Sequence, residues 1–537
     1  MFVLSESNRS SGGECIAGAG HLVRHTLGRF ALLGAALFAV TSLPVMAAHV
    51  PPLVDYVNHL ARIYIIANDG RDAALSQYYA VHWALIPNLS MDLVVPPLVR
   101  ALGIYAAGKL FLLVIIALLV TGPHAIYHAL YRRFSSWPFV ACLFIYNDSF
   151  SGGLTNYLFG VGVALWGVAA WISLTRAHVG VRVAVSSAFV LVLYLCHLAA
   201  AGIYLIAVAS FELWRAYSDV RTYRRRLVLN LAPLFLAMVV VLLLHHFQPG
   251  SVSHQVLRWT VAAKIRGITW TFESEQMFRL ADALISATVI TGIAGFAWWR
   301  GILRCHPAGV PLLVASIAAF LAAPSEIMGA SGVDSRLPIA FLFVVIGFLD
   351  WNAPSARQRG AFLLALALLL ASRIGVVEYA WRAMAVDTAD MEQSAAAIKR
   401  GGKVLVARVD HPSYRAASWL YYLPCLMMIE RSALVSLAYS DPTQQVLAVK
   451  PPFRDMAGGF NDDPPSLSEL TSPPTTSPSS PSGRIYWNNW QKNYDYVYLV
   501  SLNGESPAVP SSLKEIYEAH HFRLYAVVRP PAATLSR

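Results

Sequence analysis

Charged side chains are scarce in this chain of 537 residues: Asp, Glu, Lys and Arg together make up only 13%. A soluble globular protein carries about 25%. The 56% of residues that are hydrophobic gather in runs of roughly 16–20, the length of a helix that crosses a bilayer core about 30 Å thick. The shortage of charge therefore excludes an ordinary soluble protein and predicts a polytopic α-helical membrane protein.

Cysteines and the common cofactor motifs are also scarce. Of the five cysteines, only Cys425 falls in the large polar region after residue 383, so that region has no internal disulfide, even in an oxidising compartment. The chain has no CxxC or HExxH spacing, no Walker loop and no GxGxxG after a strand. These absences leave metal binding and nucleotide binding without support from motifs.

The apolar runs predict about eleven membrane spans. They lie near residues 30–48, 104–122, 137–150, 153–174, 183–198, 200–214, 227–245, 281–299, 309–323, 337–351 and 360–379. Loops rich in Arg and Lys stay in the cytoplasm. Arg clusters precede the first span and then fall in every second loop, at residues 24–29, 132–133, 176–182, 221–226, 300–304 and 357–359. We therefore expect the N-terminus inside and the C-terminus outside. The net charge of +11 follows from these loops and does not imply a nucleic-acid partner.

The spans divide the chain into three parts. Residues 1–29 form a polar cytoplasmic tail, residues 30–382 a transmembrane domain, and residues 383–537 an outer domain. The transmembrane domain has outer loops at 49–103, 246–280 and 324–336. An alternative treats the first apolar run as a signal peptide, because Val45-Met46-Ala47-Ala48 resembles a signal-peptidase site. Cleavage there would not change which side the rest of the chain faces.

The outer domain is expected to be a small α/β unit. Residues 391–399 have a helical pattern, and residues 403–407, 496–500 and 522–528 are rich in β-branched and aromatic side chains, as strands are. A run rich in Pro, Ser and Thr at residues 461–484 interrupts the domain and predicts a flexible loop.

Asp55 and His59 are the candidate catalytic residues. They follow the first span directly and lie four apart, so a helix would present both on one face. Apolar residues around Leu60 and Ile63 predict an amphipathic helix that lies along the membrane. An ionisable residue at a bilayer surface is costly unless it has a use. We expect Asp55 to act as a general base and His59 to orient it or to bind phosphate. The alternative is a solvated loop in which Asp55 caps a helix.

Other polar residues on the outer side are candidate substrate ligands. Asp92 offers a second carboxylate, and Asn156 follows the outer turn that contains Asp148. Asp148 could join Asp55 around an acceptor sugar or around a divalent cation, Mg²⁺ or Mn²⁺. The alternative for Asp92 and Asp148 is an ordinary role in turns, where Asp is common.

Histidines and basic residues on the outer side are candidate phosphate ligands. His197 lies between two apolar runs, and His246 ends another. Lys264 and Arg336 depart from the inside placement of basic residues. Cations at this level can bind the phosphate of a lipid-linked substrate. The alternatives are histidines bonded to the backbone, and an interfacial helix whose basic residues touch anionic membrane lipids.

The layout of the chain resembles the GT-C superfamily of integral-membrane glycosyltransferases, which use polyprenyl- or dolichyl-phosphate sugars and include mannosyl- and arabinosyltransferases. A cytoplasmic N-terminus, a long first outer loop that opens with Asp55, many spans and an outer C-terminal domain carry the resemblance. It implies a catalytic Asp in the first outer loop, a role that transfers to Asp55 alone. The usual pair of adjacent acidic residues is absent, because Tyr56 follows Asp55.

The resemblance implies transfer of a sugar from a polyprenyl-phosphate donor to a glycan, lipid or protein acceptor, at the outer face of a bacterial inner membrane. Phosphate is a good leaving group. Such a reaction therefore needs one base for the acceptor hydroxyl and cations for the departing phosphate, and it inverts the anomeric centre. The alternatives are a transporter or flippase, which would carry ionisable residues near the middle of its spans, and a scaffold that displays the outer domain.

Overall fold

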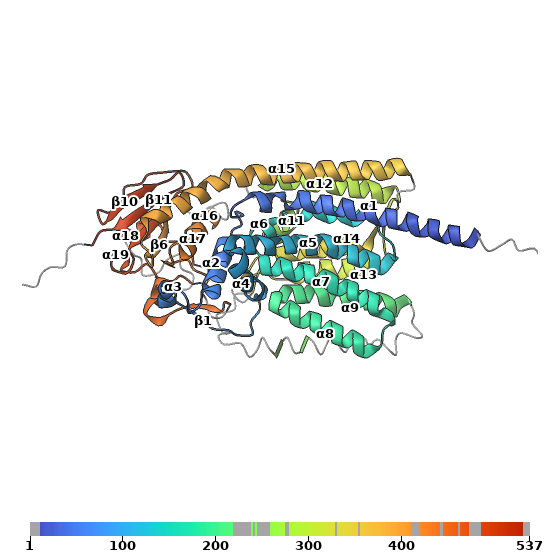
Figure 1. Ribbon diagram of the computed structural model, residues 1–537, viewed down its shortest axis with the longest axis horizontal. Coiled ribbons are helices and arrows are strands. Elements are labelled where there is room, and N and C mark those ends of the chain that lie inside the picture. Colours follow the sequence, from blue (N-terminus) through green and yellow to red (C-terminus); the bar gives the residue numbers. More distant parts are fainter. Residues whose placement is uncertain are drawn as a thin grey trace, which may run out of the picture.

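The computed structural model describes residues 11–218, 238–239, 242–243, 258–273, 279–327, 330–352, 355–409, 418–440, 444–459, 462–471 and 485–529. Figure 1 shows long helices that run side by side, with a small β-sheet at one end, here called the sheet end of the bundle. The helix α1 begins at Ser11, inside the segment predicted as a polar tail.

Six helices among the described residues are long and apolar enough to cross a membrane. They are α1 (Ser11–Ala47), α5 (Ile104–Tyr131), α7 (Thr155–Ser173), α8 (Val179–Cys196), α9 (Leu198–Ser218) and α15 (Ala356–Ser394). Three further helices belong to the same bundle: α12 (Arg279–Trp299), α13 (Gly309–Ala322) and α14 (Val333–Phe348). A helical fold with several helices long and apolar enough to span a membrane is therefore confirmed, whereas the number of about eleven spans is not. The predicted span at 227–245 lies almost entirely outside the described residues.

The predicted span at 137–150 is not an α-helix. Both α5 and α7 begin at the sheet end, so the chain between Tyr131 and Thr155 must return through the bundle. It does so through the 3₁₀-helix η1 (Trp137–Phe144) and the single turn α6 (Asp148–Ser151). A 3₁₀-helix rises about 2.0 Å per residue, so this one covers only about half of a hydrocarbon core, and irregular chain completes the passage.

The helix α15 joins the bundle to the outer domain. A capping box between Ser355 and Gln358 starts it, and it continues for 39 residues. The sequence predicted two helices, at 360–379 and 391–399, on either side of a domain boundary. The first continues into the start of the second as far as Ser394, because residues 380–390 contain neither Gly nor Pro and nothing there ends the helix.

The small sheet has five strands in the order β10-β11-β9-β6-β7. Their bounds are β6 (Lys403–Arg408), β7 (Leu434–Val435), β9 (Tyr496–Val500), β10 (Leu513–Glu518) and β11 (Phe522–Val527). β6 runs parallel to both of its neighbours, and the other pairs are antiparallel. The three predicted strands are confirmed as β6, β9 and β11. Most of the predicted flexible loop at 461–484 lies outside the described residues.

The first outer loop fills the space between bundle and sheet. It contains α2 (Tyr56–Ala67), α3 (Ala73–Tyr78), β1 (Tyr79–Val81) and α4 (Ser90–Leu102). The predicted amphipathic helix is α2, but it does not lie on a surface: every residue except Tyr64 and Ile66 is buried. The prediction failed because α2 packs against both α4 and the outer-domain helix α17 (Leu426–Glu430), so its polar face meets protein instead of water.

Short elements complete the described structure. They are α11 (Val261–Phe272), α16 (Ser418–Tyr422), α18 (Leu467–Thr471), α19 (Trp490–Asn493), β2 (Leu303–Cys305), β3 (Glu326–Ile327), β4 (Ala330–Ser331), β5 (Leu349–Trp351), β8 (Leu447–Val449), η2 (Leu174–Arg176), η4 (Ala395–Ala397), η5 (Leu423–Cys425) and η6 (Pro451–Met456). Of these, β8 matters most for the site, because it pairs antiparallel with β1 and fastens the first outer loop to the outer domain.

Candidate functional site

Asp55 stands immediately before α2, at the N-cap position, yet its side chain makes no capping hydrogen bond. Its carboxylate instead accepts a hydrogen bond of 2.7 Å from the phenol of Tyr439 in the outer domain. The backbone N–H of Asp55 donates to the carbonyl of Gly152 at 3.1 Å. Asp55 is half-buried, so the carboxylate lies at a junction of three segments without being sealed from solvent.

Gly153 allows the close approach that holds Asp55. Its φ is +76°, and a Cβ atom built there would lie 2.9 Å from the backbone nitrogens of Asp55 and Tyr56. Any other residue would therefore be strained in conformation and would push α2 away. The turn after α6 is thus packed directly on the main chain of Asp55.

Asn58 fastens the outer-domain segment 437–440 to α2. Its side-chain amide donates to the carbonyl of Leu437 at 2.8 Å and accepts from the N–H of Tyr439 at 2.9 Å. Asn58 is buried and lies one helical turn from Asp55. These two bonds fix the backbone from which the side chain of Tyr439 extends to Asp55.

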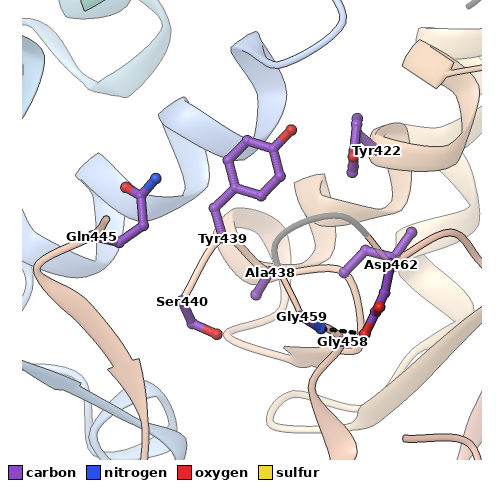
Figure 2. A pocket seen from close by; sticks show the side chains of 9 residues that line it. Tyr422, Ala438, Tyr439, Ser440, Gln445, Gly458, Gly459 and Asp462 are labelled. Carbon is purple, nitrogen blue, oxygen red and sulfur yellow. Dashed lines mark hydrogen bonds between the residues drawn. The ribbon is translucent and has the colours of Figure 1, made fainter. Parts of the chain in front are cut away.

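A pocket opens beside Tyr439. Figure 2 shows the side chains that line it, among them Tyr422, Ser440, Gln445 and Asp462. The carboxylate of Asp462 accepts from the N–H of Gly459 at 2.6 Å, which closes one wall. Amide, hydroxyl and carboxylate groups beside an aromatic ring are the groups that can recognise a polyhydroxylated ligand.

His59 is buried on α2, with its ring edge-on to Tyr439 at a centroid distance of 6.0 Å. Burial, and then the charge of Arg62, hold the pKa of His59 well below its usual range. The ring is therefore neutral at physiological pH. Its Nδ1 has no hydrogen-bond partner among the described residues. A neutral ring packed on Tyr439 fits an orienting role better than the binding of phosphate charge.

Asp92 and Asn156 have structural partners. Asp92 receives two hydrogen bonds from the guanidinium of Arg62, at 2.7 and 3.1 Å, in a pair that is almost wholly buried. The amide oxygen of Asn156 accepts from the hydroxyl of Ser90 and from the N–H of Met91, and so satisfies the start of α4. Both residues hold α4 in place, and neither lines the pocket beside Tyr439.

Asp148 is the first residue of α6 and is half-buried. Its carbonyl accepts from the N–H of Gly152 at 2.7 Å, so the residue shapes the turn that touches Asp55. Among the described residues, no three His, Cys, Asp or Glu side chains are grouped in a way that could hold a metal ion. A divalent cation between Asp55 and Asp148 therefore gains no support from the arrangement of ligands.

His197 and Arg336 meet at the sheet end of α8, α9 and α14. Nη1 of Arg336 lies 3.4 Å from Nε2 of His197, and the carbonyl of Arg336 accepts from the phenol of Tyr157 at 2.6 Å. Burial, and then the charge of Arg336, lower the pKa of His197 to about 3. His197 is therefore neutral, and Arg336 supplies the positive charge of the pair.

Lys264 is buried and forms an ion pair with Asp334 at 3.0 Å. Its ammonium also donates to the carbonyl of Ala323 and lies over the rings of Trp259 and Phe320. The pair joins α11 to the first turn of α14, two residues before Arg336. His246, the remaining predicted ligand, lies outside the described residues.

Two residues that the sequence did not suggest, Asn58 and Tyr439, organise the surroundings of Asp55. Tyr439 is 384 residues from Asp55 along the chain, and no spacing connects them. The only available signal was the polar character of Asn58, which lies between Asp55 and His59.

No protein-family model matches this sequence, and no curated protein matches it. Two solved structures are similar to it. A cryo-EM structure of the arabinofuranosyltransferase AftD from Mycobacteria aligns over 93% of this chain, with 15% identity and a TM-score of 0.45. This chain spans 40% of that protein's length. A crystal structure of ArnT from Cupriavidus metallidurans bound to undecaprenyl phosphate aligns over 94% of this chain and 99% of its own, with 11% identity and a TM-score of 0.46. Similarity at these levels of identity and TM-score assigns neither a superfamily nor an activity to this chain.

Proposed function

We propose that this chain is a membrane glycosyltransferase that moves a sugar from a polyprenyl-phosphate donor to an acceptor hydroxyl at the sheet end of the bundle. The observation that carries the proposal is the direction of the Asp55 side chain. It occupies a capping position without capping its helix, and its carboxylate turns to Tyr439, beside a polar pocket. This favours the catalytic interpretation of Asp55 over the alternative of a helix cap.

The reaction requires a single base. Asp55 accepts the proton of the acceptor hydroxyl while that oxygen bonds to the anomeric carbon of the donor sugar. The bond from the anomeric carbon to the phosphate oxygen breaks, and its electron pair leaves with the lipid phosphate. Attack opposite the leaving group inverts the anomeric centre. No acid is needed, because the departing phosphate is already a stable anion.

Arg336 is the cation that we assign to the departing phosphate. The start of α7 and the turn before it connect Arg336 to the base: Gly153 in the turn touches the main chain of Asp55, and Tyr157 in the helix donates to the carbonyl of Arg336. Gly153 lies two residues before the first residue of α7, Thr155, and Tyr157 lies in the first turn of the helix. A guanidinium can donate two parallel hydrogen bonds to a phosphate, and His197 beside it can add a neutral donor. Lys264 is already paired with Asp334, so we assign it a structural role.

We further propose that the sheet end is extracytoplasmic and that the acceptor, a glycan, lipid or protein, enters beside the outer domain. A transporter is the second candidate. Two of the charged side chains within the predicted spans, Glu212 and Arg373, are bound by protein. Glu212 pairs with Arg182 at 2.8 Å, and Arg373 donates to the hydroxyl of Ser286 and to the carbonyl of Phe272. Charges held in this way do not favour a route for a solute through the bundle.

The test is donor turnover by the purified protein in lipid nanodiscs. Undecaprenyl-phosphate-linked mannose and undecaprenyl-phosphate-linked arabinose are offered with envelope lipid and glycan fractions, and the release of undecaprenyl phosphate is measured. We expect Asp55→Asn to slow turnover by about 10²–10⁴-fold, because an amide cannot accept the proton. The matched control is Asp69→Asn, which alters an exposed carboxylate of the same loop.

Two results would contradict the proposal. Equal turnover by wild type and Asp55→Asn excludes Asp55 as the base, and equal losses in both variants point to disturbed folding of the loop. Addition of EDTA tests the cation alternative: loss of turnover that Mg²⁺ or Mn²⁺ restores would show that the reaction needs a divalent cation.

A further inference from the structure

We propose that Tyr439 is a positioning residue for Asp55, so that the outer domain completes the active site instead of merely sitting above it. The inference rests on the proposed function, because it needs Asp55 to be the base. It assigns to the outer domain a direct part in the chemistry, through one phenol and the segment 437–440 that carries it.

The geometry at Asp55 is specific. The phenol of Tyr439 donates to one carboxylate oxygen of Asp55 at 2.7 Å, the length of a strong hydrogen bond to an ionised acceptor. Asp55 does not use its side chain to cap α2, so its rotation is not set by its own helix. The bond to Tyr439 therefore helps to fix the direction in which the carboxylate faces an acceptor hydroxyl.

Tyr439 is itself held from two directions. The side-chain amide of Asn58 binds the backbone on both sides of Ala438, through the carbonyl of Leu437 and the N–H of Tyr439. The ring of Tyr439 packs edge-to-face on Tyr422 at a centroid distance of 5.3 Å. Both partners of this hydrogen bond thus depend on α2. Asp55 directly precedes the helix, and Asn58 within it anchors the segment that carries Tyr439.

The interface around this segment is extensive enough to keep it in place. β1 pairs with β8 over three residues, and the phenol of Tyr79 donates to the carbonyl of Ala433 at 3.3 Å. The carboxylate of Asp72 receives hydrogen bonds from Arg400 and Ser432, each at 2.7 Å. These contacts join the first outer loop to the outer domain at several points, so the reach of Tyr439 to Asp55 does not depend on one bond.

The phenol stays protonated. Burial, and then the charge of Asp55, raise the pKa of Tyr439 well above its usual range. The same two causes raise the pKa of the neighbouring Tyr422. Tyr439 therefore remains a hydrogen-bond donor at neutral pH, and it does not compete with Asp55 for the proton of the acceptor hydroxyl.

Tyr439 also lines the pocket with Ser440, Gln445 and Asp462 (Figure 2). A group bound in that pocket would touch the same tyrosine that holds the base. We expect the hydroxylated part of the acceptor to occupy it, because the lining offers amide, hydroxyl and carboxylate groups and no cluster of cations that would suit the donor's phosphate.

The test compares four proteins in the donor-turnover assay: wild type, Asp55→Asn, Tyr439→Phe and Tyr79→Phe. Tyr79→Phe is the matched control, because it also removes a phenol that spans the same interface, but one that binds the carbonyl of Ala433. We expect Tyr439→Phe to lower kcat about 10- to 100-fold, the size of effect that follows from a misplaced catalytic group, with the KM for the donor little changed.

The pH dependence separates positioning from general damage. A carboxylate that has lost a hydrogen-bond donor is protonated more easily, so the acid limb of kcat/KM should move to higher pH in Tyr439→Phe. It should not move in Tyr79→Phe. Loss of interface packing alone would lower the melting temperature of both variants and leave the limb in place.

Three results would overturn the inference. If Asp55→Asn is inactive while Tyr439→Phe keeps the kcat and the pH profile of the wild type, positioning by Tyr439 is refuted and the proposed function stands. Fully active Asp55→Asn refutes both. Equal effects of Tyr439→Phe and Tyr79→Phe assign the loss to the interface. If Tyr439→Phe does not fold, Asn58→Ala decides: it keeps the phenol but releases its backbone, so reduced kcat at a normal melting temperature supports the inference, and wild-type kcat overturns it.

Discussion

Arg62 and Asp92 form a two-point ion pair beneath the candidate site. Nε and Nη2 of Arg62 lie 2.7 and 3.1 Å from the two carboxylate oxygens of Asp92, and the side chains are 1% and 2% exposed. The pair joins α2, which begins beside Asp55, to α4. A buried pair of this kind is costly to form but far more costly to break, because removal of one partner leaves a buried charge uncompensated.

We therefore expect Asp92→Asn to reduce stability by about 3–5 kcal/mol. Thermal unfolding of the purified protein in detergent should show a clearly lower melting temperature. The double variant Arg62→Met with Asp92→Leu should recover most of that loss, since two apolar side chains can fill the space without leaving a charge. Asp495→Asn serves as the control, because Asp495 pairs with the exposed Arg529 and such pairs contribute about 0–1 kcal/mol.

The same variants test the sequence-based interpretation of Asp92. A normal melting temperature in Asp92→Asn, together with a raised KM for donor or acceptor, would contradict the structural role and support substrate binding. We expect Asp92→Asn to have a lower melting temperature and the molecules that remain folded to have an unchanged KM.

The sequence was sufficient for the parts of the fold that depend on local pattern. Apolar runs identified the long helices, and clusters of β-branched and aromatic residues identified β6, β9 and β11. The sequence was insufficient where two different structures can produce the same apolar pattern. Residues 137–150 are apolar enough to cross a membrane, but they do so mainly as a 3₁₀-helix, and hydropathy does not distinguish the two.

The candidate site shows a different limit. Asp55 could be chosen from its place after the first span, because that argument needs only local sequence. Tyr439 could not, because its contact with Asp55 arises when the outer domain folds back on α2. Lys264 was predicted from charge placement to bind phosphate. Its ion-pair partner Asp334 lies 70 residues away, and a pair so far apart in the chain cannot be inferred from one sequence.

Arg336 should govern capture of the lipid phosphate. We expect Arg336→Gln to weaken binding of undecaprenyl phosphate by about 10- to 100-fold, the equivalent of one or two hydrogen bonds to a charged group. Binding is measured by the ligand-induced rise in melting temperature, which reports affinity without turnover. The control is Arg304→Gln, an exposed arginine beyond the end of α12. Equal affinity in wild type and Arg336→Gln would remove Arg336 from the donor site.

Lys264 should behave in the opposite way. Because it is buried against Asp334, Lys264→Met should lower the melting temperature and leave the affinity of the folded protein for undecaprenyl phosphate unchanged. Lys264→Met combined with Asp334→Leu should be more stable than Lys264→Met alone. A stable Lys264→Met protein with weakened lipid binding would restore the phosphate role that the sequence suggested.

His59 and His197 should make the protein less stable in acid. Burial lowers the pKa of both rings in the folded state, to about 3 for His197, whereas in the unfolded chain they titrate near 6.5. Below about pH 6.5 the unfolded state binds protons that the folded state does not, so stability falls as the pH falls. Each histidine contributes a slope of up to about 1.4 kcal/mol per pH unit.

Melting temperatures measured from pH 7.5 to pH 5 check this expectation. The decline should be shallower in His59→Gln and in His197→Gln than in wild type, and shallowest in the double variant. His82→Gln is the control, because His82 is exposed. Parallel curves for all four variants and wild type would show that neither buried ring contributes to acid sensitivity.

The orientation of the chain decides on which side of the membrane the chemistry occurs. Arg133 and Asp350 form an ion pair, so the loop after α5 and the segment before α15 lie at the same end of the bundle, and α15 then runs the full length to the outer domain. Residues 133 and 359 should therefore share one side, with the C-terminus on the other. The arginines near both sites predict that this shared side is cytoplasmic.

Reporter fusions after residues 133 and 359 should read cytoplasmic, and a fusion after residue 537 should read extracytoplasmic. Opposite readings at residues 133 and 359 would contradict the arrangement of the bundle. A cytoplasmic C-terminus with extracytoplasmic readings at residues 133 and 359 would preserve the fold but would place Asp55 and its pocket on the cytoplasmic face.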